Sequence, residues 1–186
     1  MYTLYRPIVH DENAQPETLC QWMEACDHDR YSIANSEIIM TQASPSPAAD
    51  CLICASETAD DDAVVFRDEL WACEVTPGYE APGWLILRAR DHVVGWDGLS
   101  EAALDTFARQ AKRVVGAVAT ATGAAATYVM TFGESYPHFH VLIVPRGQDV
   151  PPEHRSANIL QLRQQLLDRE AALALVPAIQ KAYETA

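Results

Sequence analysis

Two histidines near residue 140 have the types and spacing of a reactive site. His138 and His140 lie in a segment, Gly133 to Val144 (GESYPHFHVLIV), in which polar loop residues lead into an apolar run. Alternation with a period of two predicts a strand that carries both imidazoles on one face. Pro145 lacks a backbone donor, so we expect it to end that strand. Such a pair is either structural and half-buried, or a site where one imidazole reacts and the other positions it or binds metal.

A second group of residues has the chemistry of metal ligands. Cys51 and Cys54 form a C-x-x-C motif, which alone could equally be a redox pair or two buried thiols. With His92 and His138 they would make a Cys₂His₂ set, which suits tetrahedral zinc and leaves no open coordination position. Such a zinc site is structural. Redox use is less favoured, because no thioredoxin-like βαβ pattern surrounds the motif.

Bulk properties restrict the class of partner. The chain has 186 residues, a formal net charge of −13 and a sequence pI near 4.7. This charge argues against binding nucleic acid or an anionic membrane through a basic surface, although backbone amides could still bind a small anion. No apolar run is long enough to span a bilayer, the start lacks a signal-peptide core, and five cysteines do not indicate a disulfide framework. We therefore expect a cytoplasmic protein.

The order of predicted elements indicates an α+β domain after an N-terminal extension. Residues 1–50 comprise the extension, with a possible short helix at 17–26 and a Pro/Ser-rich linker at 42–50. Residues 51–186 form the domain. A long helix is expected from an N-cap at Ser100 to Gly123, and a helical tail from Ser156 with a break near Pro177. Strands are expected at 63–66, 70–75, 84–87, 128–132 and 138–144, and short connections favour an antiparallel sheet.

The histidine segment resembles the active-site strand of the histidine-triad (HIT) family of nucleotide hydrolases and transferases. That family's pattern is G-Q-[ST]-x-P-H-x-H-x-H-x-x-P-R. Two positions depart from it: Glu134 stands in place of glutamine, and Leu142 stands in place of the third histidine. The resemblance covers about residues 51–146. The matching positions are Gly133, Ser135, Pro137, His138, His140, Pro145 and Arg146.

The resemblance implies a fold, a cofactor and an assembly. The fold is a HIT-like antiparallel sheet of about five strands with a long helix and a C-terminal helical tail, and the assembly is a homodimer. Zinc-bearing relatives hold a structural Zn²⁺ at the positions of Cys51, Cys54, His92 and His138.

The resemblance also implies roles for the residues of the active-site loop. His140 would attack the α-phosphorus of a small-molecule nucleotide and form a covalent nucleotidyl-histidine. Gly133 and Ser135 would bind the phosphate through backbone N–H groups and a hydroxyl. Glu134 would be repulsive there unless it acts as an acid. Glu74 falls where the family has its acidic ribose contact.

These roles lead to a leading function and two alternatives. The leading function is a nucleotide hydrolase or nucleotidyltransferase acting at the α-phosphate, of the dinucleoside polyphosphate or nucleoside phosphoramidate type. The first alternative is a zinc-stabilised nucleotide-binding module with little or no turnover, suggested by Leu142 and Glu134. The second is a protein-interaction role for residues 1–50, which match nothing in the family.

Overall fold

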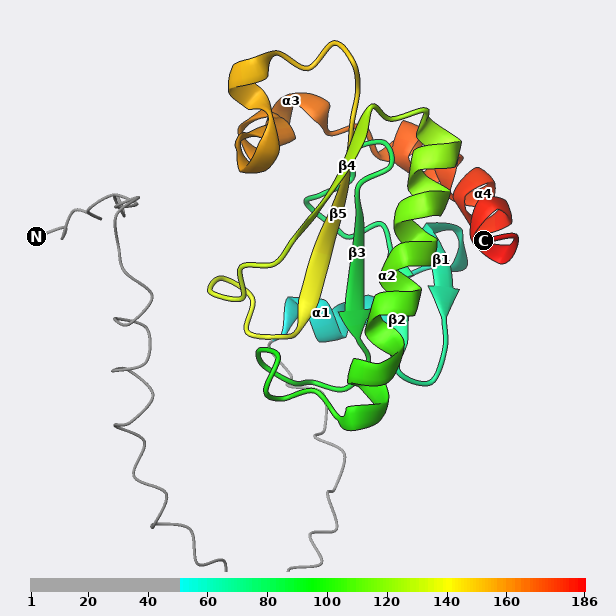
Figure 1. Cartoon of the computed structure of the whole chain (residues 1–186), viewed down its shortest axis with the longest axis vertical. Coiled ribbons are helices and arrows are strands. Elements are labelled where there is room, and N and C mark those ends of the chain that lie inside the picture. Colours follow the sequence, from blue (N-terminus) through cyan, green and yellow to red (C-terminus); the bar gives the residue numbers. More distant parts are fainter. Residues whose placement is uncertain (1–50) are drawn as a thin grey trace, which may run out of the picture. The chain divides into compact units, whose positions relative to one another are not determined.

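The computed structural model describes residues 51–186 (Figure 1). The expectations for residues 1–50, including the short helix at 17–26 and the linker, lie outside the described residues. No helix in the described part of the chain is long and apolar enough to cross a bilayer.

The core of the domain is an antiparallel sheet of five strands, which confirms the predicted α+β class. The strands lie in the order β1-β2-β3-β5-β4, so β3 is central, β5 lies between β3 and β4, and β1 and β4 are the edges. In register, Arg88 of β3 lies opposite His140 of β5, and Ile86 opposite Leu142. The bounds are β1 (Val64–Arg67), β2 (Trp71–Glu74), β3 (Leu85–Ala89), β4 (Ala126–Met130) and β5 (His140–Arg146).

Helix α2 (Glu101–Thr122) has both of its predicted ends. The Ser100 hydroxyl accepts a hydrogen bond from the Ala103 N–H, which satisfies a donor that the first turn leaves unpaired. Gly123 adopts a left-handed conformation with φ of +64° and ends the helix. The apolar face predicted from helical spacing packs on the sheet, with Val114 and Val118 fully buried.

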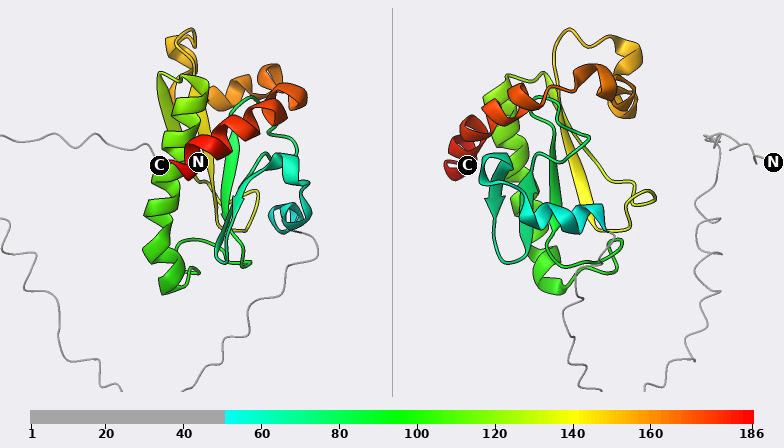
Figure 2. Two further views of the ribbon diagram at one scale, coloured as in Figure 1. Left: turned by 90° about the vertical axis from the view of Figure 1, so that its right-hand side faces the viewer. Right: turned by 180° about the vertical axis from the view of Figure 1, so that it is seen from behind.

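The two faces of the sheet are covered differently. Helices α2 and α4 (Arg169–Glu184) cover the face that carries Leu87, Val141 and Ile143 (Figure 2). Because side chains alternate along a strand, His140 and Leu142 point to the opposite face. That face carries the candidate site. It is covered by the short helix α1 (Leu52–Ala55) and the 3₁₀ turns η3 (Ser56–Thr58) and η6 (Ser156–Leu162), whereas Ala63 of η4 (Asp61–Ala63) packs in the core on the helix-covered face.

The C-terminal tail differs from the prediction in the position of its break. It consists of the turns η5 (Pro152–His154) and η6 and the helices α3 (Arg163–Leu166) and α4. The break lies between α3 and α4, where the Asp168 side chain caps α4, and the expected break near Pro177 is wrong. Pro177 lies inside α4 on its exposed side, where a carbonyl that loses its N–H partner can reach water.

Strand β5 also differs from the prediction at both ends. It begins at His140, so His138 lies in the loop just before it, and it continues through Pro145 to Arg146. The Arg146 carbonyl accepts from Ala125 on the β4 side, so the Pro145 nitrogen faces the other side. The pairing between β5 and β3 stops at Ile143. The lack of an N–H on Pro145 therefore removes no hydrogen bond from the sheet.

Candidate functional site

The four predicted metal ligands come together in the described domain. The ligand atoms of Cys51, Cys54, His92 and His138 all lie within 4.8 Å of one another. His138 Nδ1 is 3.5 Å from Cys51 Sγ and 3.3 Å from Cys54 Sγ, and His92 Nδ1 is 3.3 Å from Cys54 Sγ. Zn–S bonds of about 2.3 Å and Zn–N bonds of about 2.0 Å at tetrahedral angles require N···S separations of about 3.5 Å. The observed spacing therefore suits a structural zinc ion.

Local hydrogen bonds orient three of these ligands towards a common point. Cys51 is the N-cap of α1, and its sulfur accepts from the Cys54 N–H at 3.4 Å, so one turn presents both thiols to the same point. The His138 Nε2–H donates to the Ala89 carbonyl at 2.8 Å, which leaves Nδ1 for the metal. Burial lowers the pKa of His138 to about 4, so its imidazole is neutral and able to bind metal at neutral pH.

His140 is oriented as a nucleophile requires. Its Nδ1 lies 2.7 Å from the His138 carbonyl, to which Nδ1–H donates. This bond selects the tautomer whose Nε2 carries a free lone pair. Tyr136 packs edge-on to the imidazole with ring centroids 6.2 Å apart. His140 lines a pocket on this face of the sheet, so its imidazole is accessible to a ligand.

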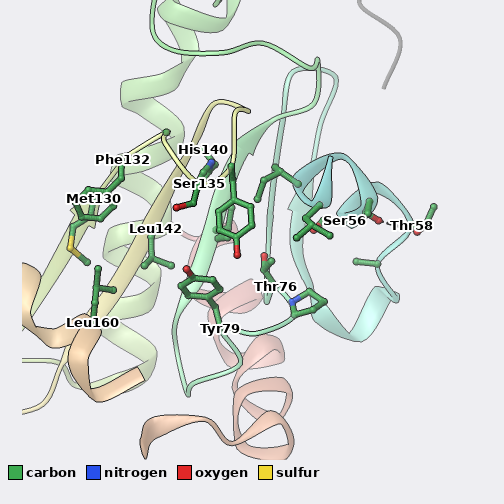
Figure 3. Close-up of a pocket in the computed structure, with 18 residues that line it drawn as sticks. Ser56, Thr58, Thr76, Tyr79, Met130, Phe132, Ser135, His140, Leu142 and Leu160 are labelled. Carbon is green, nitrogen blue, oxygen red and sulfur yellow. Dashed lines mark hydrogen bonds between the residues drawn. The ribbon is translucent and has the colours of Figure 1, made fainter. Parts of the chain in front are cut away.

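The pocket has a volume of about 410 Å³ and lies beside His140 (Figure 3). His140 and Ser135 lie towards one end of it, and Tyr79 and Leu160 towards the other. No Asp, Glu, Lys or Arg is among the described residues that line it. The pocket therefore fits a ligand whose buried part is uncharged and largely apolar.

Two carboxylates assigned to the site from sequence do not reach this pocket. Glu134 is exposed and Glu74 is fully buried, and neither lines the pocket. Glu74 Oε1 instead accepts from Arg88 Nε at 2.6 Å. The catalytic role expected of Glu134 and the ribose contact expected of Glu74 therefore stay predictions, to which the lining of this pocket adds no support. The first carboxylate is exposed and the second takes part in an ion pair.

Leu142 lines the floor of the pocket, two residues from His140 on the same face of β5. It is 7% exposed and packs in an apolar cluster with Trp84, Ile86 and Val144. Leu142 pairs with Ile86 of β3, so its branched apolar side chain packs against another apolar side chain. The pocket floor consequently offers no proton donor at this position.

A buried ion-pair network lies beneath the pocket. Arg88 and Glu74 are both fully buried, and Arg88 also donates to Glu57 at 2.8 Å. Burial raises the pKa of Glu74, and the Arg88 charge offsets part of that rise. Burial alone would also raise the pKa of Glu57, but hydrogen bonds from Arg90 and Arg88 lower it to about 2. The network joins the segment after the metal-binding turn to β2 and β3.

We expect Arg88→Met to lower the free energy of unfolding by roughly 3–5 kcal/mol, because it leaves the buried Glu74 carboxylate unpaired. Urea unfolding measures this. Arg169→Met is the matched control, because Arg169 is 57% exposed and its ion pair is long, with 3.7 Å between Arg169 Nη1 and Glu80 Oε1. This variant should lower the free energy of unfolding by less than about 1 kcal/mol. Equal losses in the two variants would show that the Glu74 carboxylate is not held by Arg88.

Sequence reasoning missed most of the pocket wall. Thr76, Tyr79 and Met130 lie at strand ends or just beyond them, and Leu160 comes from η6, far along the chain. The alternation of Glu74 and Thr76 with buried residues of β2 places Thr76 on the His140 face. Leu160 has no comparable sequence signal, because its approach depends on tertiary packing.

Comparison with known proteins shows a structural likeness only. No protein-family model matches the sequence, and no curated protein matches it. Solved structures that match include a hypothetical histidine triad nucleotide-binding protein from Sulfolobus tokodaii, with 20% identity and a TM-score of 0.57, covering 73% of this chain and 93% of that one.

Two further matches extend the likeness. One is a Zn-bound histidine triad family protein from Mycobacterium smegmatis, with 18% identity and a TM-score of 0.55, covering 73% of this chain and 96% of that one. The other is a uridylyltransferase, with 16% identity and a TM-score of 0.52, covering 73% of this chain and 45% of that one. On this likeness, the described domain has the fold of the histidine triad proteins.

Proposed function

We propose that this protein is a nucleotide hydrolase or nucleotidyltransferase that acts at the α-phosphate through a covalent nucleotidyl-histidine. The single observation that carries the proposal is the 2.7 Å bond from His140 Nδ1 to the His138 carbonyl, at the edge of a pocket. The bond leaves the Nε2 lone pair free for attack. The names of the structural neighbours, a nucleotide-binding protein and a uridylyltransferase, support nucleotide chemistry.

The proposed reaction has two steps. His140 Nε2 attacks the α-phosphorus and forms a P–N bond, while the bond from phosphorus to the leaving group breaks and its electron pair goes to that group. Water or a second acceptor then attacks the same phosphorus, and the P–N bond breaks to return the imidazole. The leaving group of the first step takes up a proton from solvent, and the water or other acceptor that attacks in the second step releases one to solvent.

The loop before His140 would stabilise the phosphate. Gly133 adopts a φ of +69°, a left-handed conformation that glycine adopts without strain, and both Gly133 and Ser135 line the pocket. Backbone N–H groups and the Ser135 hydroxyl would donate to the non-bridging oxygens as charge develops on them. The four metal ligands would hold a Zn²⁺ that fixes the start of the domain against His138 and the loop around His92, without taking part in the reaction.

A binding module with little or no turnover is the second candidate. It is favoured by Leu142, which gives the pocket floor no proton donor near His140, and by the exposed position of Glu134. A nucleotide could then bind without an acid to assist the leaving group. We also expect a homodimer, and we expect residues 1–50 to be dispensable for the core fold.

Turnover of two substrate types separates the two candidates. We expect the full chain to release AMP from adenosine 5′-phosphoramidate or from a diadenosine polyphosphate, with the products separated by chromatography. The first substrate has a leaving group that is protonated easily and the second has a phosphate leaving group. AMP that binds without release of product from either substrate would support the binding module instead.

A further inference from the structure

Thr76 carries an unexplained polar group inside the pocket. It lies just after β2, is only 7% exposed and lines the pocket (Figure 3). Its Oγ1 is buried and has no hydrogen-bond partner in the described part of the chain. A buried hydroxyl without a partner destabilises a fold, whereas an apolar side chain of the same shape would not. The hydroxyl is therefore unused by the folded protein itself.

The surroundings of Thr76 indicate what would meet this hydroxyl. The pocket wall around it contains the rings of Tyr79 and Tyr136 and the apolar side chains of Ile86 and Met130. Such a wall suits a flat ring system, and the lack of charged lining residues suits an uncharged one. A threonine hydroxyl can both donate and accept, so it can satisfy a polar atom on the edge of that ring.

Thr76 lies away from the end of the pocket where His140 would react. His140 and Ser135 lie at the end where the phosphate would bind, and Figure 3 shows Thr76 and Tyr79 away from that end. A nucleotide with its α-phosphate at His140 would extend its base along the pocket towards these two residues.

We propose that Thr76 is a specificity-determining residue whose hydroxyl forms a hydrogen bond to the nucleobase of the bound nucleotide. The proposal rests on the proposed function for the identity of the ligand. It explains why an otherwise apolar pocket retains a buried hydroxyl without a partner in the protein. Thr76 takes no part in the covalent step, which belongs to His140.

The test compares Thr76→Val with Thr127→Val in the full chain. Thr127 Oγ1 is also buried and without a partner in the described domain, but Thr127 lies on β4 and does not line the pocket. Valine keeps the shape and removes the hydroxyl in both variants. We expect Thr76→Val to weaken AMP binding about tenfold, measured by calorimetry, and Thr127→Val to leave it unchanged.

Two further measurements decide between binding and structural roles. The melting temperature without ligand should not fall in either variant, because neither hydroxyl is bonded in the folded protein. AMP and 2′,3′-dideoxy-AMP should lose equal affinity in Thr76→Val, because the base is common to both. A loss for AMP alone would assign the bond to the sugar and overturn the base assignment, and a lower melting temperature in Thr76→Val alone would make the hydroxyl structural.

The outcomes also separate this proposal from the proposed function. Wild-type AMP affinity in Thr76→Val overturns the role of Thr76 whether or not the protein turns over substrate. If AMP binding is weaker in that variant but the wild-type protein shows no turnover, the base contact of Thr76 is supported and the proposed enzymatic function is rejected. A wild-type chain that binds no AMP at millimolar concentration overturns the Thr76 proposal, while turnover is judged by its own assay.

Discussion

His140→Ala abolishes nucleotide turnover, by roughly a thousandfold or more, if the imidazole is the attacking group. The reason is a division of roles between two close histidines. His138 would bind the metal through Nδ1 and donates from Nε2 to the Ala89 carbonyl, which would leave it no lone pair for attack. His140 keeps Nε2 free beside the pocket. Each factor of ten in rate is about 1.4 kcal/mol of barrier.

Two controls make the His140→Ala result specific. His154→Ala removes a histidine of η5 that does not line the pocket, and it should keep wild-type turnover. Zinc content and the urea unfolding midpoint should match wild type in both variants. If His140→Ala turns over substrate at the wild-type rate, His140 is not the nucleophile.

Loss of the metal site should have the largest effect on stability. We expect one zinc per chain by elemental analysis, and Cys51→Ser should lose it and lower the free energy of unfolding by roughly 5 kcal/mol or more. A metal ion bound by these four residues would join α1, the loop at His92 and the loop at His138. Without it, the segment that covers one side of the pocket should lose its attachment.

The matched control for the metal is Cys73→Ala. Cys73 is fully buried in β2 among apolar residues, away from the other two described thiols, and burial raises the pKa of its thiol. This variant should be less stable because it leaves a cavity, yet it should retain one zinc per chain. Protein purified without chelator that contains no metal would contradict the zinc assignment.

Much of the fold could be predicted because its signals are local. The Ser100 cap, the Gly123 end of α2 and the apolar spacing between them are set within one helix. The five strands follow from alternation and from short connections, although β4 and β5 are each displaced by two residues at their start. The metal ligands were predicted from the C-x-x-C motif with two later histidines and from the resemblance to zinc-bearing HIT proteins, and the structure brings these four residues together.

The surroundings of Glu74 and Glu134 could not be predicted, because they depend on tertiary packing. Glu74 was assigned to a ribose because its sequence position matched, but strand pairing brings Arg88 to it from 14 residues away. Glu134 occupies the position of the family's glutamine, and in the structure it is exposed. Local sequence determines neither the register of β2 and β3 nor the exposure of a loop side chain.

Mass spectrometry of protein quenched in base during turnover tests the central claim most directly. Adenosine 5′-phosphoramidate is the substrate, because its small leaving group leaves the adenylyl group as the mass added to the enzyme. The account predicts an adenylyl adduct on the peptide that contains His140, absent from His140→Ala. Turnover without any adduct, or an adduct on another residue such as Ser135, would contradict it.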